Sequence, residues 1–262
     1  MVGNMRTIIF SKNRAAQLDL LLRSIERFAP WLEPCVLYTA DGPDFLRGYE
    51  RVFDAHEVKK YYEKRSFKEE VVSLIPSSGL IQFLVDDDVF INEWQEASLV
   101  LADRIDVVGV SLRLHPGVTY AYTRRENNPV PKISNGVWYW KRAQGHWNYP
   151  FSLDGDVYRV EDISESLMSS DFSGPNQFEG AMLGGIMPLI QKYPRAMCYE
   201  LPKIINIPWN RVQNTVCNSH EGKDAKAMNQ KFLDGHRIRT DNIYHIKSNS
   251  IHQPIELVLE KR

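Results

Sequence analysis

Three consecutive aspartates are the strongest chemical signal in this sequence. Asp86, Asp87 and Asp88 stand between two apolar runs, so they are not part of a solvated acidic tail. Adjacent carboxylates repel one another unless a positive group neutralises them. A divalent ion with oxygen ligands would do so, and Mn²⁺ or Mg²⁺ would also contact phosphate oxygens. The cluster therefore predicts a metal site; the alternative is an acidic loop that precedes a helix near Asn92.

Three segments that the apolar pattern predicts as strands end in polar residues. The segments are 7–11, 36–39 and 80–85, and the polar residues at or just after their ends are Ser11, Asp41 and Asp86. Ligands in parallel α/β sheets bind beyond the carboxyl ends of the strands. We therefore expect these three side chains to face one ligand at one edge of a sheet.

Helices are predicted between these strands. Leu18, Leu21, Leu22 and Ile25 recur at helical spacing, in a helix that Asn13 or a neighbour opens. A capping box, Ser66 to Glu69, begins a second helix that runs through Ile75. The alternation of strands and helices is typical of a parallel sheet covered on both faces, an α/β fold.

The aspartate cluster after a hydrophobic strand resembles the Asp-X-Asp motif of GT-A glycosyltransferases. The segment 8–14 before a leucine-rich helix, and the strand that runs into Asp41-Gly42, resemble the same family, over residues 6–113 in all. The Val-Asp-Asp-Asp form is also locally similar to exostosin-type transferases. The resemblance implies a GT-A-like (Rossmann-like), mostly parallel central sheet flanked by helices, with a mixed C-terminal acceptor half.

The resemblance also implies roles for individual residues. Asp86 and Asp88 would contact the metal and the donor diphosphate, and Asp87 the donor ribose or sugar. Asp41 would contact the base or ribose. The other residues implied in the nucleotide pocket are Ser11, Asn13 and Arg14. A guanidinium suits a diphosphate because it donates paired hydrogen bonds; the alternative for Arg14 is a surface cation near a helix start.

A sugar transfer with inversion requires a carboxylate base for the acceptor hydroxyl. We favour Asp154 and Glu179, because turn residues and glycines surround both. Asp154 is alternatively part of a hairpin turn, and Glu179 the third residue of a capping box with Asn176. Asp156 and Glu161 are further candidates for the base.

A histidine from the C-terminal part of the chain often completes the metal shell in the GT-A fold. His220 is our candidate for this ligand. His245 is a second candidate, and His252 is less favoured. Each is alternatively an ordinary polar residue.

The second half of the chain gives a different pattern. A strand over 106–113 precedes a region rich in aromatic and turn residues, and helices are predicted over 176–191 and 224–234. A late strand is predicted over 255–260. We expect one domain, 1–262, with a nucleotide-binding half over 6–113 and an acceptor-binding half over 114–262.

Composition narrows the function classes. The 262 residues are 43% hydrophobic and carry a formal net charge of -1, which gives no electrostatic reason to expect nucleic-acid binding. Three scattered cysteines imply no disulfide framework. The longest apolar runs fall short of the ~20 residues that span a bilayer. We expect a cytoplasmic protein, with peripheral association at the inner face of the membrane compatible with this pattern.

The sequence thus predicts a metal-dependent glycosyltransferase. It would move a sugar from a nucleoside-diphosphate sugar to a glycan, lipid-linked or other glycoconjugate acceptor in polysaccharide assembly. A sugar nucleotidyltransferase would carry a glycine-rich loop where Ser11 to Arg14 stand. A haloacid-dehalogenase-type phosphatase would have Thr or Val where Phe90 stands. A non-catalytic carbohydrate-binding protein would not need three clustered carboxylates.

Overall fold

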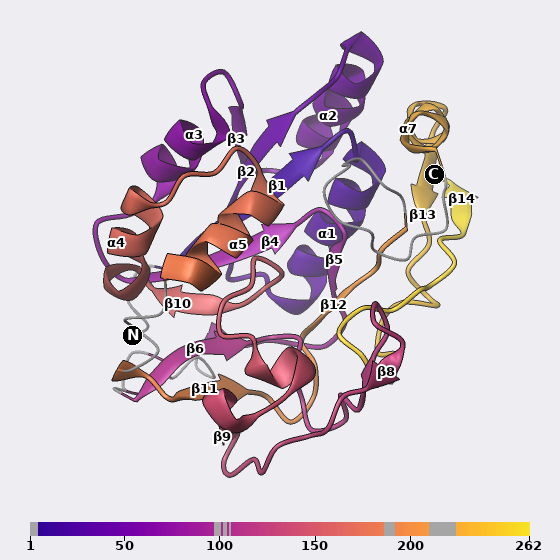
Figure 1. Cartoon of the computed structure of the whole chain (residues 1–262). Helices are drawn as coiled ribbons and strands as arrows, with labels where there is room; N and C mark the ends of the chain where they lie inside the picture. Colours follow the sequence, from indigo (N-terminus) through magenta and orange to yellow (C-terminus); the bar gives the residue numbers. More distant parts are fainter. Residues whose placement is uncertain (1–4, 97–100, 102–103, 105, 186–191, 210–223) are drawn as a thin grey trace.

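The computed structural model (Figure 1) describes residues 5–96, 101, 104, 106–185, 192–209 and 224–262. Its centre is an eight-stranded sheet in the order β3-β2-β1-β4-β10-β6-β11-β9. The strands are β1 (Met5–Lys12), β2 (Pro34–Thr39), β3 (Lys59–Tyr62), β4 (Leu80–Val85), β6 (Val107–Ser111), β9 (Val137–Tyr139), β10 (Val157–Arg159) and β11 (Arg195–Cys198).

The sheet is mostly parallel on its N-terminal side and mixed on the other. β1 runs parallel to β2 and β4, and β3 runs parallel to β2. β10 lies antiparallel between β4 and β6, while β11 is parallel to β6 and antiparallel to β9. The predicted α/β class, with a mostly parallel sheet and a mixed C-terminal half, is confirmed.

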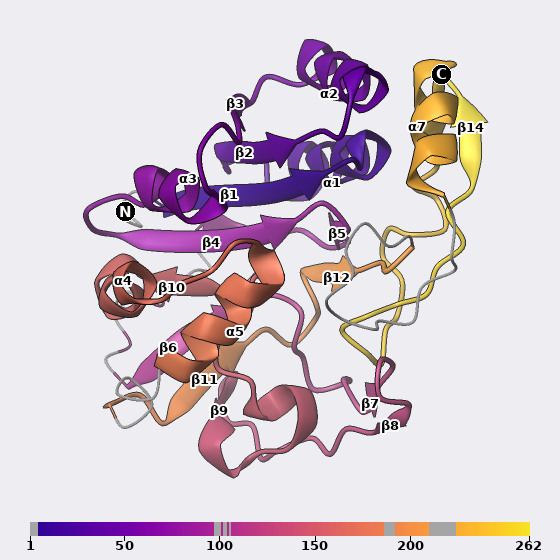
Figure 2. The same cartoon turned by 45° about the horizontal axis from the view of Figure 1, so that its top comes forward.

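Helices lie on both faces of the sheet (Figure 2), and alternating side chains of β1 pack in two separate hydrophobic layers. Ile9 packs in the core that α1 (Ala15–Phe28), α2 (Pro43–Ala55) and α7 (Ala225–Leu233) share. Ile8 and Phe10 point the other way, into the core formed with α3 (Phe67–Leu74), α4 (Val160–Ser169) and α5 (Pro175–Gly185). This period of two is what a strand covered on both faces requires.

Most predicted elements are present. The capping box of α3 is complete, because the Ser66 side chain accepts from the Glu69 N–H and the Glu69 carboxylate accepts from the Ser66 N–H. Asn13 does not cap α1, whose N-cap is Arg14. α2 and β3 were not predicted.

Over the described residues the predicted helix 176–191 is present as α5, whereas the predicted late strand is too long. α5 ends at Gly185 among the described residues, and 186–191 lie outside them. The late strand, β14, covers Leu259–Lys261 only and pairs with β13 (His236–Ile238). The residues from Ile255 to Val258 precede it without forming a strand, although the Val258 carbonyl still accepts from Arg239 N–H.

The end of β4 and the segment that follows it are held in place by contacts with distant parts of the chain. β5 (Asp88–Phe90) pairs antiparallel with β12 (Ile204–Asn206). The Gly155 N–H bonds the Phe83 carbonyl at 2.7 Å, and Gly155 has a φ of +91°. A Cβ at Gly155 would come within 2.5 Å of the Ile204 side chain. Only glycine therefore allows this close approach without strain.

A short ribbon, β7 (Tyr120–Ala121) with β8 (Glu126–Asn127), lies near two turns of 3-10 helix, η3 (Trp140–Arg142) and η4 (Gly145–Asn148). Trp138, Trp140 and Trp147 are buried in this region and form a core of their own with Tyr193. Within the described residues, no helix is both long and apolar enough to cross a membrane.

Candidate active site

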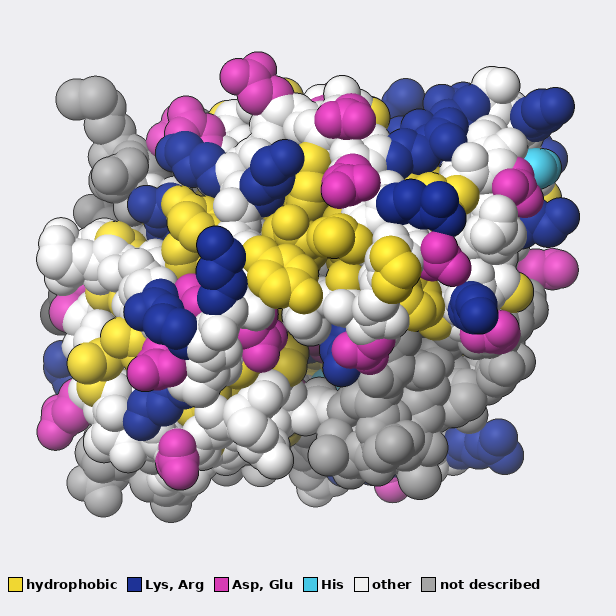
Figure 3. All heavy atoms as spheres, turned by 90° about the horizontal axis from the view of Figure 1, so that it is seen from above, with side chains coloured by type: hydrophobic (Ala, Val, Ile, Leu, Met, Phe, Trp, Pro, Cys, Tyr) yellow, Lys and Arg dark blue, Asp and Glu magenta, His cyan; other side chains and the backbone are white. Residues whose placement is uncertain are grey.

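A cavity of about 730 Å³ lies over the carboxyl ends of β1, β2 and β4. Figure 3 shows the molecule as seen from the top of Figure 1. Hydrophobic side chains gather there beside a hollow, and many charged side chains surround it. The charged residues that line the cavity are Lys12, Arg14, Glu63, Asp86, Asp87, Arg113, Arg124, Asp154 and Glu179. The predicted clustering of strand-end residues is therefore observed for Ser11 and Asp86, which both line it.

Asp86 is bound by three donors from the end of β1. Its Oδ2 accepts from the Ser11 hydroxyl at 2.8 Å and from the Lys12 N–H at 3.2 Å. Its Oδ1 accepts from Arg14 Nη1 at 2.9 Å. Burial nevertheless raises the pKa of Asp86 to about 6, against the opposing effect of Arg14.

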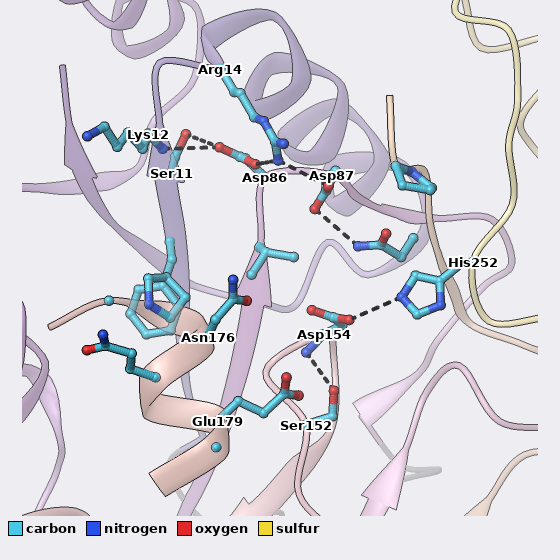
Figure 4. A pocket seen from close by; sticks show the side chains of 18 of the residues that line it. Ser11, Lys12, Arg14, Asp86, Asp87, Ser152, Asp154, Asn176, Glu179 and His252 are labelled. Carbon is cyan, nitrogen blue, oxygen red and sulfur yellow. Dashed lines mark hydrogen bonds and ion pairs between the residues drawn. The ribbon is translucent and has the colours of Figure 1, made fainter. Parts of the chain in front are cut away.

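Arg14 holds two of the three aspartates together. The same Nη1 atom lies 3.0 Å from Asp87 Oδ2, so one nitrogen bridges Asp86 and Asp87 (Figure 4). Burial raises the pKa of Asp87, and the positive charge of Arg14 opposes this. Asn206, at the end of β12, donates to Asp87 Oδ1 at 3.1 Å. Asp87 thus faces the cavity from a fixed position.

Asp88 is placed differently from its two neighbours. It is fully buried, and its Oδ2 accepts from the Val85 N–H at 3.0 Å. Its Oδ1 accepts from Asn206 at 3.1 Å. Burial raises the pKa of Asp88 well above its usual range. Among the described residues that line the cavity, Asp86 and Asp87 are present and Asp88 is not.

A second group of charged side chains forms the opposite wall of the cavity. Arg113, which follows β6, donates to Asp154 at 2.6 Å and to the Ser152 hydroxyl at 2.7 Å. Arg113 is buried, with 5% of its surface exposed. Figure 4 shows Asp154 and Glu179 pointing into the space below the Arg14–Asp86–Asp87 group.

Glu179 lies on α5, and its carboxylate accepts from the Leu153 N–H at 3.1 Å. It therefore binds the loop before β10 and does not complete a capping box with Asn176. Burial, followed by repulsion from Asp154, raises the pKa of Glu179 to about 7. Close to neutral pH, this carboxyl can both lose and regain a proton.

The predicted pocket residues Asn13 and Asp41 bind each other at the edge of the site. Asn13 Nδ2 donates to Asp41 Oδ2 at 2.9 Å, and the Asp41 N–H donates to Asn13 Oδ1 at 2.8 Å. Asn13 has a φ of +58°, which this paired contact supports. Neither residue is among the described residues that line the cavity. They join the ends of β1 and β2.

The three candidate histidines differ in their position relative to the cavity. His220 lies outside the described residues. His245 bonds Asn92 at 3.2 Å and packs on Phe28, away from the described cavity wall. His252 lines the cavity, and its Nε2 lies 3.9 Å from Asp154 Oδ2. Burial lowers the pKa of His252 to about 3, so its imidazole is neutral at pH 7.

No three His, Cys, Asp or Glu side chains within the described ranges are grouped so as to hold a metal ion. The sequence did not single out Arg113 or Asn206, which organise the site. Arg113 closes the predicted strand 106–113, so the same strand-end argument that selected Ser11 would have found it. Asn206 carries no comparable signal, because its role depends on the pairing of β12 with β5.

The sequence matches no protein-family model. It is 24% identical to the bifunctional glycosyltransferase pgtA of Dictyostelium discoideum over 303 aligned residues, which cover 95% of this chain. The chain spans 38% of the length of that relative. The predicted resemblance to glycosyltransferases is thereby confirmed.

Solved structures give a more distant likeness. One is S. aureus TarS in complex with UDP (10% identity, TM-score 0.48, covering 76% of this chain and 58% of that one). Another is S. aureus TarS in complex with UDP-GlcNAc (12% identity, TM-score 0.46, covering 76% of this chain and 56% of that one).

Proposed function

We propose that this chain is a metal-dependent glycosyltransferase that takes a sugar from a nucleoside-diphosphate sugar. One observation carries the proposal. The Arg14-bridged pair Asp86 and Asp87 faces Asp154 and Glu179 across one cavity, so a diphosphate-binding wall lies opposite a wall with carboxylates. The likeness to a glycosyltransferase supports it.

Asp87 and His252 are the residues best placed to bind a divalent ion. Asp87 is a cavity-lining carboxylate, and His252 is neutral, as a metal-binding imidazole must be. Two protein ligands fit Mn²⁺ or Mg²⁺, because such ions take substrate phosphates as further ligands. Asp86 would help to position Asp87 through Arg14, which contacts both, and Asp88 would do so through Asn206. When bound, the ion would neutralise charge on the departing diphosphate.

Arg14 would assist the same leaving group. One Nη1 atom bridges the aspartates, and Arg14 lines the cavity at the end of β1. A diphosphate accepts paired hydrogen bonds from a guanidinium. The donor sugar would then lie between this wall and Glu179, where its reacting carbon develops oxocarbenium character.

Glu179 is the better candidate for the base that takes the acceptor proton. Asp154 is held in an ion pair with Arg113, whose Nη1 lies 2.6 Å from its carboxylate. Glu179 has no ion-pair partner among the described residues, and its pKa of about 7 suits proton transfer at neutral pH. A glycan, lipid-linked or other glycoconjugate hydroxyl would approach from this side in polysaccharide assembly.

A thermal-shift panel of nucleoside diphosphates with and without Mn²⁺ tests the proposal. Binding at 100 times the Kd stabilises the protein by about 2.7 kcal/mol, which the assay detects. We expect a metal-dependent rise of Tm, and Mn²⁺-dependent hydrolysis of nucleotide-sugars in the absence of acceptor. Binding of free sugars without any response to nucleotides would instead indicate a carbohydrate-binding protein.

A further inference from the structure

Glu63 lines the cavity beside β3, the edge strand of the sheet, and has no role in the sugar transfer outlined above. It is the first residue after β3, and its N–H donates to the Tyr38 carbonyl on β2 at 2.9 Å. That contact fixes the backbone of Glu63 beside Thr39, and both residues line the cavity. Glu63 is thus a positioned member of the cavity wall.

The carboxylate of Glu63 is partly buried but has no hydrogen-bond partner among the described residues. Burial raises its pKa, and the nearby Lys12 opposes this. Lys12 itself pairs with Asp41 at 3.2 Å. Its own cation is therefore engaged elsewhere, and both oxygens of Glu63 can accept donors from a ligand.

The order of the strands determines which part of a donor reaches Glu63. The proposed transfer occurs beside β4 and β10, where Asp87 and Glu179 face each other. β3 lies three strands from β4 along the same sheet edge, which is about 14 Å at the usual strand spacing. With the sugar beside Glu179 and the diphosphate at Arg14, the nucleoside extends towards β2 and β3.

The cavity wall at this end suits a nucleobase. Phe10, Leu37 and Phe67 line the cavity there and provide an apolar surface for a planar ring. All three are buried in the core beneath, so the surface is rigid. Glu63 is the acidic group at the rim of this surface, where the hydrogen-bonding edge of a base would lie.

We propose that Glu63 selects guanine, so that the donor is a guanosine-diphosphate sugar. The inference rests on the proposed function. Guanine presents two adjacent N–H donors, N1–H and the exocyclic amine, and a carboxylate accepts both in parallel. Uracil presents one N–H between two carbonyl oxygens, and the second carboxylate oxygen would face one of them. Adenine and cytosine each present a ring acceptor beside their amine.

Inosine diphosphate provides a matched probe, because it differs from guanosine diphosphate only by the missing exocyclic amine. We would measure Kd values by calorimetry for guanosine, inosine and uridine diphosphates at one fixed Mn²⁺ concentration. Loss of one hydrogen bond to a charged group weakens the binding affinity by about 10- to 100-fold. The guanine nucleotide should bind about 10-fold or more tightly than either of the others.

Glu63→Gln should weaken guanosine-diphosphate binding about 10- to 100-fold and leave uridine-diphosphate binding within a few-fold. Glu57→Gln, an exposed site after α2, is the matched control and should change neither. Tighter binding of uridine diphosphate, or equal guanine affinity in Glu63→Gln with an unchanged Tm, would overturn the base assignment alone. Failure of every nucleotide to bind would overturn the glycosyltransferase proposal as well.

Discussion

Arg113 donates a 2.6 Å hydrogen bond to Asp154, and this ion pair distinguishes Asp154 from Glu179, the other carboxylate on that wall of the cavity. Glu179 lies on the same wall, accepts from the Leu153 N–H and has no ion-pair partner among the described residues. The two acids therefore have different chemical environments. One is paired with a cation, and the other is available to exchange a proton near pH 7.

Glu179→Gln should reduce sugar transfer by roughly 10²–10⁴-fold, because the variant lacks the proposed base. Donor affinity should change little, because the base contacts the acceptor. In the wild type, kcat/KM should rise with pH through an apparent pKa near 7, since only the ionised carboxylate accepts the proton. That acidic limb should be absent from the residual activity of the variant, as a pH series would show.

Asp154→Asn should act mainly through stability. It leaves the buried guanidinium of Arg113 without its anionic partner, and an uncompensated buried charge is strongly destabilising. We expect a lower Tm, measured by calorimetry, while Glu179→Gln keeps the wild-type value. An unchanged Tm in Asp154→Asn would mean that Asp88 or Asp156 compensates Arg113 instead.

The aspartate cluster offers a paired test of the metal assignment. Asp87→Asn should weaken Mn²⁺-dependent nucleotide binding, because Asp87 lines the cavity. Asp88→Asn should chiefly lower the free energy of unfolding, because its amide nitrogen would face the Val85 N–H or Asn206, both donors. The cost of one broken buried hydrogen bond is about 1–3 kcal/mol. Calorimetric Mn²⁺ titrations and urea denaturation separate the two effects.

The reverse outcome would restore the residue roles that the family resemblance implies. Loss of metal-dependent binding in Asp88→Asn with an unchanged fold, and normal binding in Asp87→Asn, would make Asp88 the ligand. It would also require the contacts of Asp88 with Val85 and Asn206 to open when the ion binds.

Strong local patterns predicted β1, α1, β2, α3 and β4 in the N-terminal half of the fold, although α2 and β3 were missed. The apolar strands and the capping box at Ser66 depend on neighbours within a few residues, and each formed where expected. Glu179 and Asp154, which the sequence analysis selected, both line the cavity, but the difference in their environments was not predicted. That difference depends on Arg113, which is 41 residues from Asp154. Contacts between distant segments leave no periodic trace in a sequence, which is why the second half was harder to predict.

Asp156 provides a pH test that is independent of catalysis. Burial raises its pKa to about 6, so the native state binds its proton more tightly than the unfolded chain does. Its stabilising contribution is present at low pH and is lost as pH rises from about 4 to about 6. The free energy of unfolding of the wild type, relative to Asp156→Asn, should therefore fall over that range. Urea denaturation at several pH values, without added metal, measures the difference, and a rise would contradict it.

Arg14→Lys separates the structural role of Arg14 from ligand binding. In the wild type, a single Nη1 atom bridges Asp86 and Asp87, and the residue lines the proposed diphosphate site. A lysine lacks the planar fork of donors that suits a diphosphate, but it can pair with both aspartates through its single nitrogen. The variant should therefore keep most of its stability.

Nucleoside-diphosphate binding by Arg14→Lys should weaken about 10-fold or more, because a charge-assisted hydrogen bond to the ligand is lost. Arg47→Lys is the control, since Arg47 is exposed and pairs with Asp44 on α2. Calorimetric Kd values with Mn²⁺ present would show the effect, and Tm would report on the fold. Wild-type affinity in Arg14→Lys would mean that the guanidinium serves only to hold the aspartates together.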